Sequence, residues 1–205
     1  MKHRKIALIA LVLSLGGVAQ AEVSANLGFA SDYFYRGILQ APNSVSSGLD
    51  FERAGFYAGT WAADVKDGLE IDAYFGYGGD IGGIGYSAGY TGYFYSGDFD
   101  DTYQELNFGV SYGLVSADIA VGQYDNFGGA TLNYTYYSLM LEKNGLYGKF
   151  AGFSEDFAGE YLEVGFATSI ADVDIGFAAI FANSDLVGSS DESLVLTIGK
   201  SFDLN

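Results

Sequence analysis

The chain contains no cysteine, one proline and one histidine among its 205 residues. Without cysteine it can form neither a disulfide framework nor a thiolate metal site. The histidine, His3, lies in a segment that we expect to be removed, so the remaining chain has no imidazole for general acid–base or triad chemistry. We therefore expect no catalytic residue, no metal site and no cofactor, and we predict that the protein is not an enzyme.

Basic residues are also scarce, with nine Lys and Arg against 26 Asp and Glu. This charge argues against nucleic acid as a partner. Three of the basic residues precede an apolar run at residues 6–15, and Ala19-Gln20-Ala21 follows as a small-x-small cleavage site. This order is typical of a secretory signal peptide. We therefore expect residues 1–21 to be cleaved and residues 22–205 to be exported as one domain.

After residue 21 the sequence has no apolar run of the roughly 20 residues that a transmembrane helix needs, but it has many short alternating segments. In "GLEIDAYFGYGG", Leu69, Ile71 and Phe75 fall on one side of an extended chain, whereas Glu70 and Asp72 fall on the other. A period of two predicts a strand with one apolar and one polar face. Twelve such segments, most of about 8–12 residues, are separated by turn residues, which is the length of a tilted membrane strand. The sequence predicts an all-β fold, a transmembrane antiparallel up-and-down β-barrel of about 12 strands.

The connections and the aromatic residues support this interpretation. With the N-terminus in the periplasm, even-numbered connections are expected to be short and odd-numbered ones longer. The first connection is expected to run through "ILQAPNS", residues 38–44. Aromatic side chains at both ends of the outward face are expected to form two girdles at the membrane interfaces. The girdle residues would be Tyr33, Tyr35, Tyr57, Tyr77, Tyr86, Phe94, Tyr112, Phe181 and Phe202.

The opposite faces of the same strands carry charged residues that we expect to line the lumen. An acidic lumen of low dielectric concentrates cations and repels anions. Tyrosines on these faces, namely Tyr74, Tyr93, Tyr95, Tyr137 and Tyr161, would pack in the lumen or stack on sugars. The predicted pore-lining residues are Asp32, Arg36, Asp50, Glu52, Glu70, Asp72, Glu105, Asp118, Lys149, Glu163 and Asp174.

Two stretches carry a resemblance to a known family. "SDYFYRGILQ" at Ser31–Gln40 and "GFYAGTWAADV" at Gly55–Val65 resemble the signatures of TorF-family porins of Gram-negative bacteria. The resemblance implies a channel in the outer membrane, in contact with lipid and lipopolysaccharide. Periplasmic chaperones and the barrel-assembly machinery are the partners expected during its biogenesis.

The sequence therefore predicts an outer-membrane porin, a passive diffusion channel for small solutes with a preference for cations. Two alternatives stay open. One is a non-conducting structural or adhesive barrel, and the other is a soluble periplasmic β-sandwich in which the apolar rows form a core.

Overall fold

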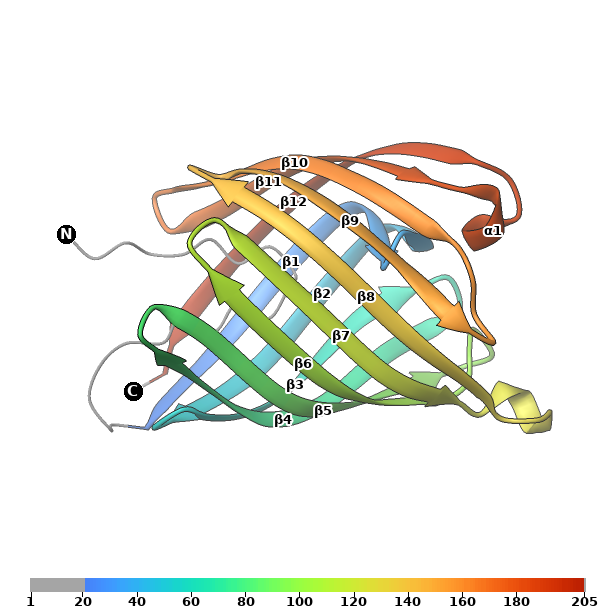
Figure 1. The fold of residues 1–205 in the computed structure, drawn as a ribbon, viewed down its shortest axis with the longest axis horizontal. Coiled ribbons are helices and arrows are strands. Elements are labelled where there is room, and N and C mark those ends of the chain that lie inside the picture. Colours follow the sequence, from blue (N-terminus) through green and yellow to red (C-terminus); the bar gives the residue numbers. More distant parts are fainter. Residues whose placement is uncertain (1–20, 205) are drawn as a thin grey trace.

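The structure, a computed structural model, describes residues 21–204 and is a closed barrel of twelve antiparallel strands (Figure 1). Each strand pairs with its neighbours in sequence, and β1 pairs with β12 to close the ring. The predicted fold class is confirmed. The expected signal peptide lies, except for its last residue, outside the described residues. The elements are β1 (Glu22–Tyr35), β2 (Ile38–Arg53), β3 (Phe56–Val65), β4 (Gly68–Ile81), β5 (Ile84–Ser96), β6 (Tyr103–Tyr112), β7 (Val115–Tyr124), η1 (Asn126–Gly128), β8 (Leu132–Lys143), β9 (Leu146–Glu155), β10 (Glu160–Ile170), β11 (Val173–Ala182), α1 (Ser184–Val187) and β12 (Asp191–Asp203).

The even-numbered connections are all two-residue turns, as expected, and they lie at the end of the barrel that holds the start of β1 and the end of β12. Asn144-Gly145 is one of them, with φ angles of 55° and 83°, and such left-handed pairs suit the twist of a tight hairpin. We call the opposite end the loop end, because four of its connections are longer. These four run through residues 97–102, 125–131, 156–159 and 183–190.

The expected long first connection is wrong. Strands β1 and β2 remain paired up to Tyr35 and Ile38, so only Arg36 and Gly37 join them. The "ILQAPNS" stretch belongs to β2, where Pro42 pairs in register with Asp32. The turn signals in that stretch therefore mark an irregular strand and not a loop.

The two faces of the strands differ as the alternation predicts. On β4, Leu69, Ile71 and Phe75 are exposed on the outside of the barrel, whereas Glu70 is fully buried and Asp72 is 9% exposed on the inside. Leu, Ile, Val and Phe side chains are exposed on the outer faces of the other strands too. An apolar belt around a closed barrel is the surface of a transmembrane barrel, since a soluble monomer rarely exposes such large apolar patches. No helix within residues 21–204 is long and apolar enough to cross a bilayer.

Inside the barrel, tyrosine rings pack over glycines on the neighbouring strand. The glycine opposite Tyr134 is Gly122, and a Cβ added there would lie 2.4 Å from the tyrosine ring. Tyr147 covers Gly165 in the same way, again with 2.4 Å between the added Cβ and the ring. These positions need glycine because the ring occupies the space of a side chain. The high glycine and tyrosine contents of the sequence thus reflect one packing arrangement.

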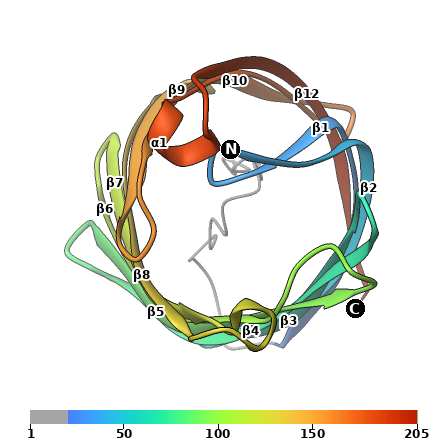
Figure 2. The same cartoon turned by 90° about the vertical axis from the view of Figure 1, so that its right-hand side faces the viewer.

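The loop end is filled from within. Figure 2 looks into this end and shows the β1–β2 turn and α1 inside the ring of strands. Leu186 and Val187 of α1 pack on a cluster of buried side chains from β7 to β12, among them Tyr134 and Tyr161. The inner wall of the loop end is therefore a packed aromatic layer.

Candidate functional site: a constriction across the lumen

Strand β1 changes its inward face between Ala30 and Tyr33, which are both buried although three residues apart. The backbone pairing of β1 with β12 ends at Ala30. At the next position the Ser31 hydroxyl accepts the backbone N–H of Leu196 at 3.0 Å. On its other side β1 keeps its register with β2 from Ala30 opposite Ser44 to Tyr33 opposite Ala41, and this register shifts only between Tyr33 and Phe34. The strand is therefore irregular where its pairing with β12 ends, and a change of inward face at that point moves every later side chain to the other face.

This irregularity reverses the predicted orientation of two girdle residues. Tyr33 is only 4% exposed and donates a hydrogen bond to Glu70 on β4 at 2.5 Å. Tyr35 donates to the hydroxyl of Tyr93 on β5 at 2.6 Å. Both rings lie inside the barrel, so the prediction that they face lipid was wrong.

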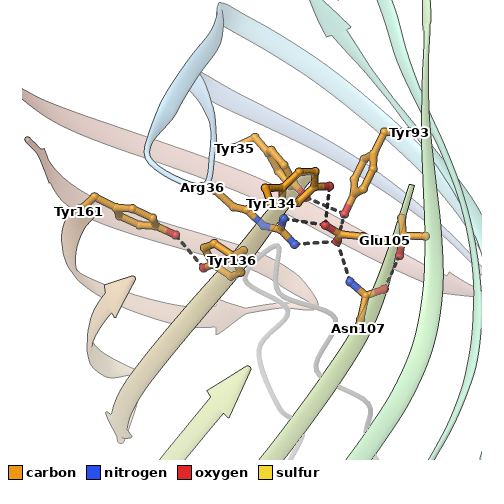
Figure 3. Close-up of polar contacts among 9 residues, drawn as sticks. Tyr35, Arg36, Tyr93, Glu105, Asn107, Tyr134, Tyr136 and Tyr161 are labelled. Atoms are coloured by element: carbon orange, nitrogen blue, oxygen red, sulfur yellow. Dashed lines mark hydrogen bonds and ion pairs between the residues drawn. The ribbon is translucent and has the colours of Figure 1, made fainter. Parts of the chain in front are cut away.

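Arg36, in the β1–β2 turn, reaches across the barrel to Glu105 on β6 (Figure 3). Four strands separate β1 from β6 on one side of the ring and six on the other. The guanidinium makes two hydrogen bonds to the carboxylate, at 2.8 and 2.7 Å, and its central carbon lies 4.1 Å from the ring centroid of Tyr136 on β8. Paired hydrogen bonds of this kind are among the strongest between side chains. The turn is thereby tied to the opposite wall.

Glu105 is the centre of this network. Besides Arg36 it accepts hydrogen bonds from Tyr93 at 2.7 Å, Tyr134 at 2.9 Å and Asn107 at 2.6 Å. Its side chain is fully buried. A buried carboxylate is stable only when its oxygens are satisfied, and here the partners of the two oxygens come from three strands and from the β1–β2 turn.

The tip of the hairpin also contacts the remaining wall. A Cβ added at Gly37, whose φ is 82°, would lie 2.7 Å from the ring of Tyr161 on β10 and 3.0 Å from Leu186 of α1. The hydroxyl of Tyr161 lies 3.0 Å from that of Tyr136. The hairpin tip, which we define as Tyr35, Arg36 and Gly37, therefore touches several sides of the ring and forms a constriction.

A second group of side chains lies beside the constriction on β3 and β4. Glu70 accepts hydrogen bonds from Tyr33 at 2.5 Å and Tyr95 at 2.9 Å. Trp61 packs edge-on against Tyr33, with 5.6 Å between the ring centroids. The Oδ1 atom of Asp72 is buried and has no hydrogen-bond partner among the described residues.

Other predicted lining residues lie further along the inner face. Asp50 accepts hydrogen bonds from Asn26 and Tyr74. Asp118 accepts one from Ser138 at 3.0 Å, and Lys149 pairs with Glu163 at 2.7 Å. Glu52 shares the inner face of β2 with Asp50, Asp174 shares that of β11 with the buried Ile180, and Asp32 lies in the irregular part of β1, opposite Pro42. That these residues line an aqueous pore remains a prediction.

Two more predicted orientations need correction. Tyr57 is 6% exposed, and its hydroxyl lies 2.3 Å from a Cβ added at Gly76 or Gly89, so it fills space inside the barrel and belongs to no girdle. Tyr137, expected inside, alternates with the buried Tyr136 and faces outward. The other predicted girdle residues are exposed on the outer surface: Tyr77, Tyr86, Phe94, Tyr112, Phe181 and Phe202.

The sequence did not single out Asn107, Tyr134 or Tyr136 as site residues. Tyr134 and Tyr136 share one face of β8 with Ser138, and all three are buried. The stretch "NYTYYSLML" alternates, but its tyrosines fall on both sides of the strand, so the sequence does not show which side faces the lumen. Within residues 21–204 no group of three or more Asp, Glu, His or Cys side chains is arranged to hold a metal ion.

A comparison with protein families finds that residues 15–185 match the family described as "Bacterial protein of unknown function (Gcw_chp)". A search of curated proteins finds no match. Among solved structures, a chain described under "Unveiling the Mechanism Behind the in-meso Crystallization of Membrane Proteins" is similar, with a TM-score of 0.61 and 8% identity over 89% of this chain and 84% of that one. This similarity concerns the fold.

Two further matches are Pseudomonas aeruginosa proteins with TM-scores below 0.5. OccK2 (OpdF) in complex with glucuronate gives 0.39 at 13% identity, over 90% of this chain and 62% of that chain. OprD gives 0.41 at 12% identity, over 90% of this chain and 67% of that chain. This chain thus spans less than two thirds of the OccK2 chain in that complex.

Proposed function

Because the chain belongs to the Gcw_chp family of bacterial proteins of unknown function, we propose its function from the barrel itself. It is an outer-membrane porin, a passive channel for small solutes that passes cations in preference to anions. The observation that supports this most is the charge of the inner face. Carboxylates are held there at Asp50, Glu70, Asp72, Glu105 and Asp118.

The basic side chains on the inner face are already neutralised. Arg36 is paired with Glu105 and Lys149 with Glu163. The remaining carboxylates therefore leave a negative potential in a tube with low-dielectric walls, where the potential is focused and cations are concentrated. Twelve strands also enclose more space than the roughly eight whose interior is filled by side chains.

The proposed location rests on the apolar outer belt and on the signal-peptide pattern of residues 1–21. A barrel with lipid on its outside and an export signal belongs in the outer membrane of a Gram-negative bacterium. The resemblance of Ser31–Gln40 and Gly55–Val65 to TorF-family porins points the same way. The prediction that the protein is not an enzyme is part of this proposal.

Planar-bilayer recording of the purified protein tests the channel and its selectivity separately. We expect discrete conductance steps and, in a KCl gradient, a reversal potential whose sign corresponds to K⁺ passing more readily than Cl⁻. The absence of conductance steps would contradict the channel. Steps with a reversal potential of the opposite sign would contradict the charge argument alone.

A non-conducting structural barrel is the second candidate, and the constriction is the observation that favours it. The hairpin tip is tied by Arg36 to Glu105 and packed by Gly37 against Tyr161. If these contacts seal the barrel, the wild type is silent, whereas the double variant R36A/E105Q conducts. The matched control is K149M/E163Q, because it removes an ion pair that lies outside the hairpin.

A further inference from the structure

We propose that Asp72 is the main ligand of a binding site for one small monovalent cation, such as K⁺ or Na⁺, on the inner wall next to the constriction. The inference rests on the proposed cation channel and deepens it, because it assigns the preference for cations to one place. It is supported by the unsatisfied carboxylate oxygen of Asp72 and by the residues that surround it.

The first observation is the state of the Asp72 carboxylate. Its side chain is 9% exposed on the inner face of β4, and its Oδ1 atom has no hydrogen-bond partner among residues 21–204. The inner-face carboxylates nearest to it differ. Glu70 accepts two tyrosine hydroxyls, and Glu105 accepts four donor groups. Burying a carboxylate oxygen away from water without a hydrogen-bond donor costs free energy. A cation or a proton bound to Asp72 would remove this cost.

The second observation is the balance of charge around Asp72. Glu70 and Glu105 are the carboxylates whose charges act on Asp72, and Arg36 is the cation. Arg36 already directs both terminal nitrogens at Glu105. Asp72 is therefore in a negative field that Arg36, already paired with Glu105, offsets only in part, and a free cation entering the lumen is drawn to it.

The third observation is the chemistry of the neighbours. In the sheet register Asp72 lies between Trp61 on β3 and Tyr93 on β5, and Tyr33 packs edge-on against Trp61. The faces of Trp and Tyr rings attract cations and add to the carboxylate. These neighbours favour an occupant with a single positive charge.

A divalent metal fits less well. Ca²⁺ prefers six to eight oxygen ligands, several of them carboxylates, and the described residues contain no group of three acidic or imidazole side chains around one point. A monovalent cation needs less charge and keeps part of its water. The site is thus suited to reversible occupation during passage.

The protein carries its own reporter for this site, because Trp61 is its only tryptophan. The purified protein in detergent is titrated with KCl that replaces N-methylglucamine chloride at constant ionic strength, while Trp61 emission is recorded. We expect a saturable change in emission, with an apparent affinity about tenfold weaker in Asp72→Asn, as expected for the loss of a full charge next to the ion. Asp64→Asn is the matched control, because it removes a carboxylate from the outer face of β3, where Asp64 is exposed between the buried Ala63 and Val65, and it should keep the wild-type response.

Three results would overturn the site. The first is an emission that is unchanged by K⁺ but follows pH, which would mean that Asp72 binds a proton instead. The second is an equal response in Asp72→Asn and the wild type, and the third is an equal loss in Asp64→Asn. If Asp72→Asn does not refold, Asp72→Glu moves the charge by one methylene and must change the affinity.

This measurement does not depend on conduction. A barrel that is silent in the bilayer but binds K⁺ at Asp72 contradicts the proposed channel and keeps the site. A conducting, cation-preferring barrel without a saturable response contradicts the site and keeps the channel.

Discussion

The ion pair between Arg36 and Glu105 gives the sharpest test of the constriction, because each charge is held by different neighbours. Replacing Glu105 by Gln leaves the Arg36 guanidinium between two tyrosine rings without an anion. Replacing Arg36 by Met leaves the Glu105 carboxylate with three uncharged donors, from Tyr93, Tyr134 and Asn107. The two single variants therefore should not be equally destabilised.

The burial of the pair sets the size of the effect. The Arg36 side chain is 12% exposed and that of Glu105 is 0% exposed. Removing one partner of a buried pair costs about 3–5 kcal/mol, because it leaves an uncompensated charge. We expect the free energy of unfolding to fall by about 5 kcal/mol in Glu105→Gln and by about 3 kcal/mol in Arg36→Met. The double variant should lose less than the sum, with a coupling energy of about 2–3 kcal/mol.

The assay is reversible urea unfolding in thin phospholipid vesicles, followed by the emission of Trp61. The control is the same cycle at Lys149 and Glu163, whose side chains are more exposed at 23% and 12%, and whose coupling should be about 1 kcal/mol. Effects at Arg36 and Glu105 that add within about 0.5 kcal/mol would refute the cross-barrel ion pair. So would a larger loss in Arg36→Met than in Glu105→Gln.

Three further predictions concern the belt, a turn and the second network. Phe75→Arg places a charge on the exposed outer face of β4. If that face meets lipid, the free energy of unfolding in vesicles should fall by about 2–4 kcal/mol. An unchanged free energy of unfolding would argue that water surrounds the barrel. Gly145→Val should lower the free energy of unfolding by about 2 kcal/mol in the same assay, because φ is 83° and the new Cβ would lie 2.2 Å from the Ala167 carbonyl oxygen. An unchanged free energy of unfolding would mean that the turn has a different conformation. Tyr33→Phe removes the hydroxyl that donates a hydrogen bond to buried Glu70, and it should lower the free energy of unfolding by about 1.5–3 kcal/mol. An unfolding midpoint equal to that of the wild type would exclude this hydrogen bond.

The barrel was predictable because regular alternation carries most of the information. In β4 the orientation of Glu70 and Asp72 follows from the period of two, and the structure confirms it. The two-residue hairpin at Asn144-Gly145 was likewise readable, because both residues tolerate positive φ. Local rules were sufficient wherever a strand is regular.

The constriction was not predictable, because it depends on a local irregularity of β1. The strand changes its inward face after Ala30, where its pairing with β12 ends, and this reverses the faces of Tyr33 and Tyr35. Pro42 lies opposite this point on β2, but the sequence around it predicts a loop and does not show that Pro42 pairs with Asp32. Tyr57 was misplaced for a different reason. Its ring fills the space above Gly76 and Gly89, and such pairing is visible only when the register of neighbouring strands is known.

The contact between Arg36 and Glu105 joins residues 69 positions apart, so no local pattern relates them. Both residues were assigned to the lumen from alternation, but as independent charges on its wall. What the sequence could not provide is the inward bend of the β1–β2 turn, which brings the charge of Arg36 across to the opposite wall.

The inner wall is not uniform along the barrel. Near the even-numbered turns some inner-face glycines face small polar residues, as Gly109 does Ser87 and Gly176 does Thr197, whereas others lie under the rings of Tyr57 and Tyr147. Toward the loop end the same strands carry tyrosines joined to buried carboxylates, with Arg36 between them. In the proposed channel, a solute that passes along the lumen meets the hairpin tip, which Arg36 ties to the opposite wall. A change in the charge of Arg36 or Glu105 should therefore alter the conductance, whereas the proposed site at Asp72 accounts for the preference for cations, so the two properties should respond to different substitutions.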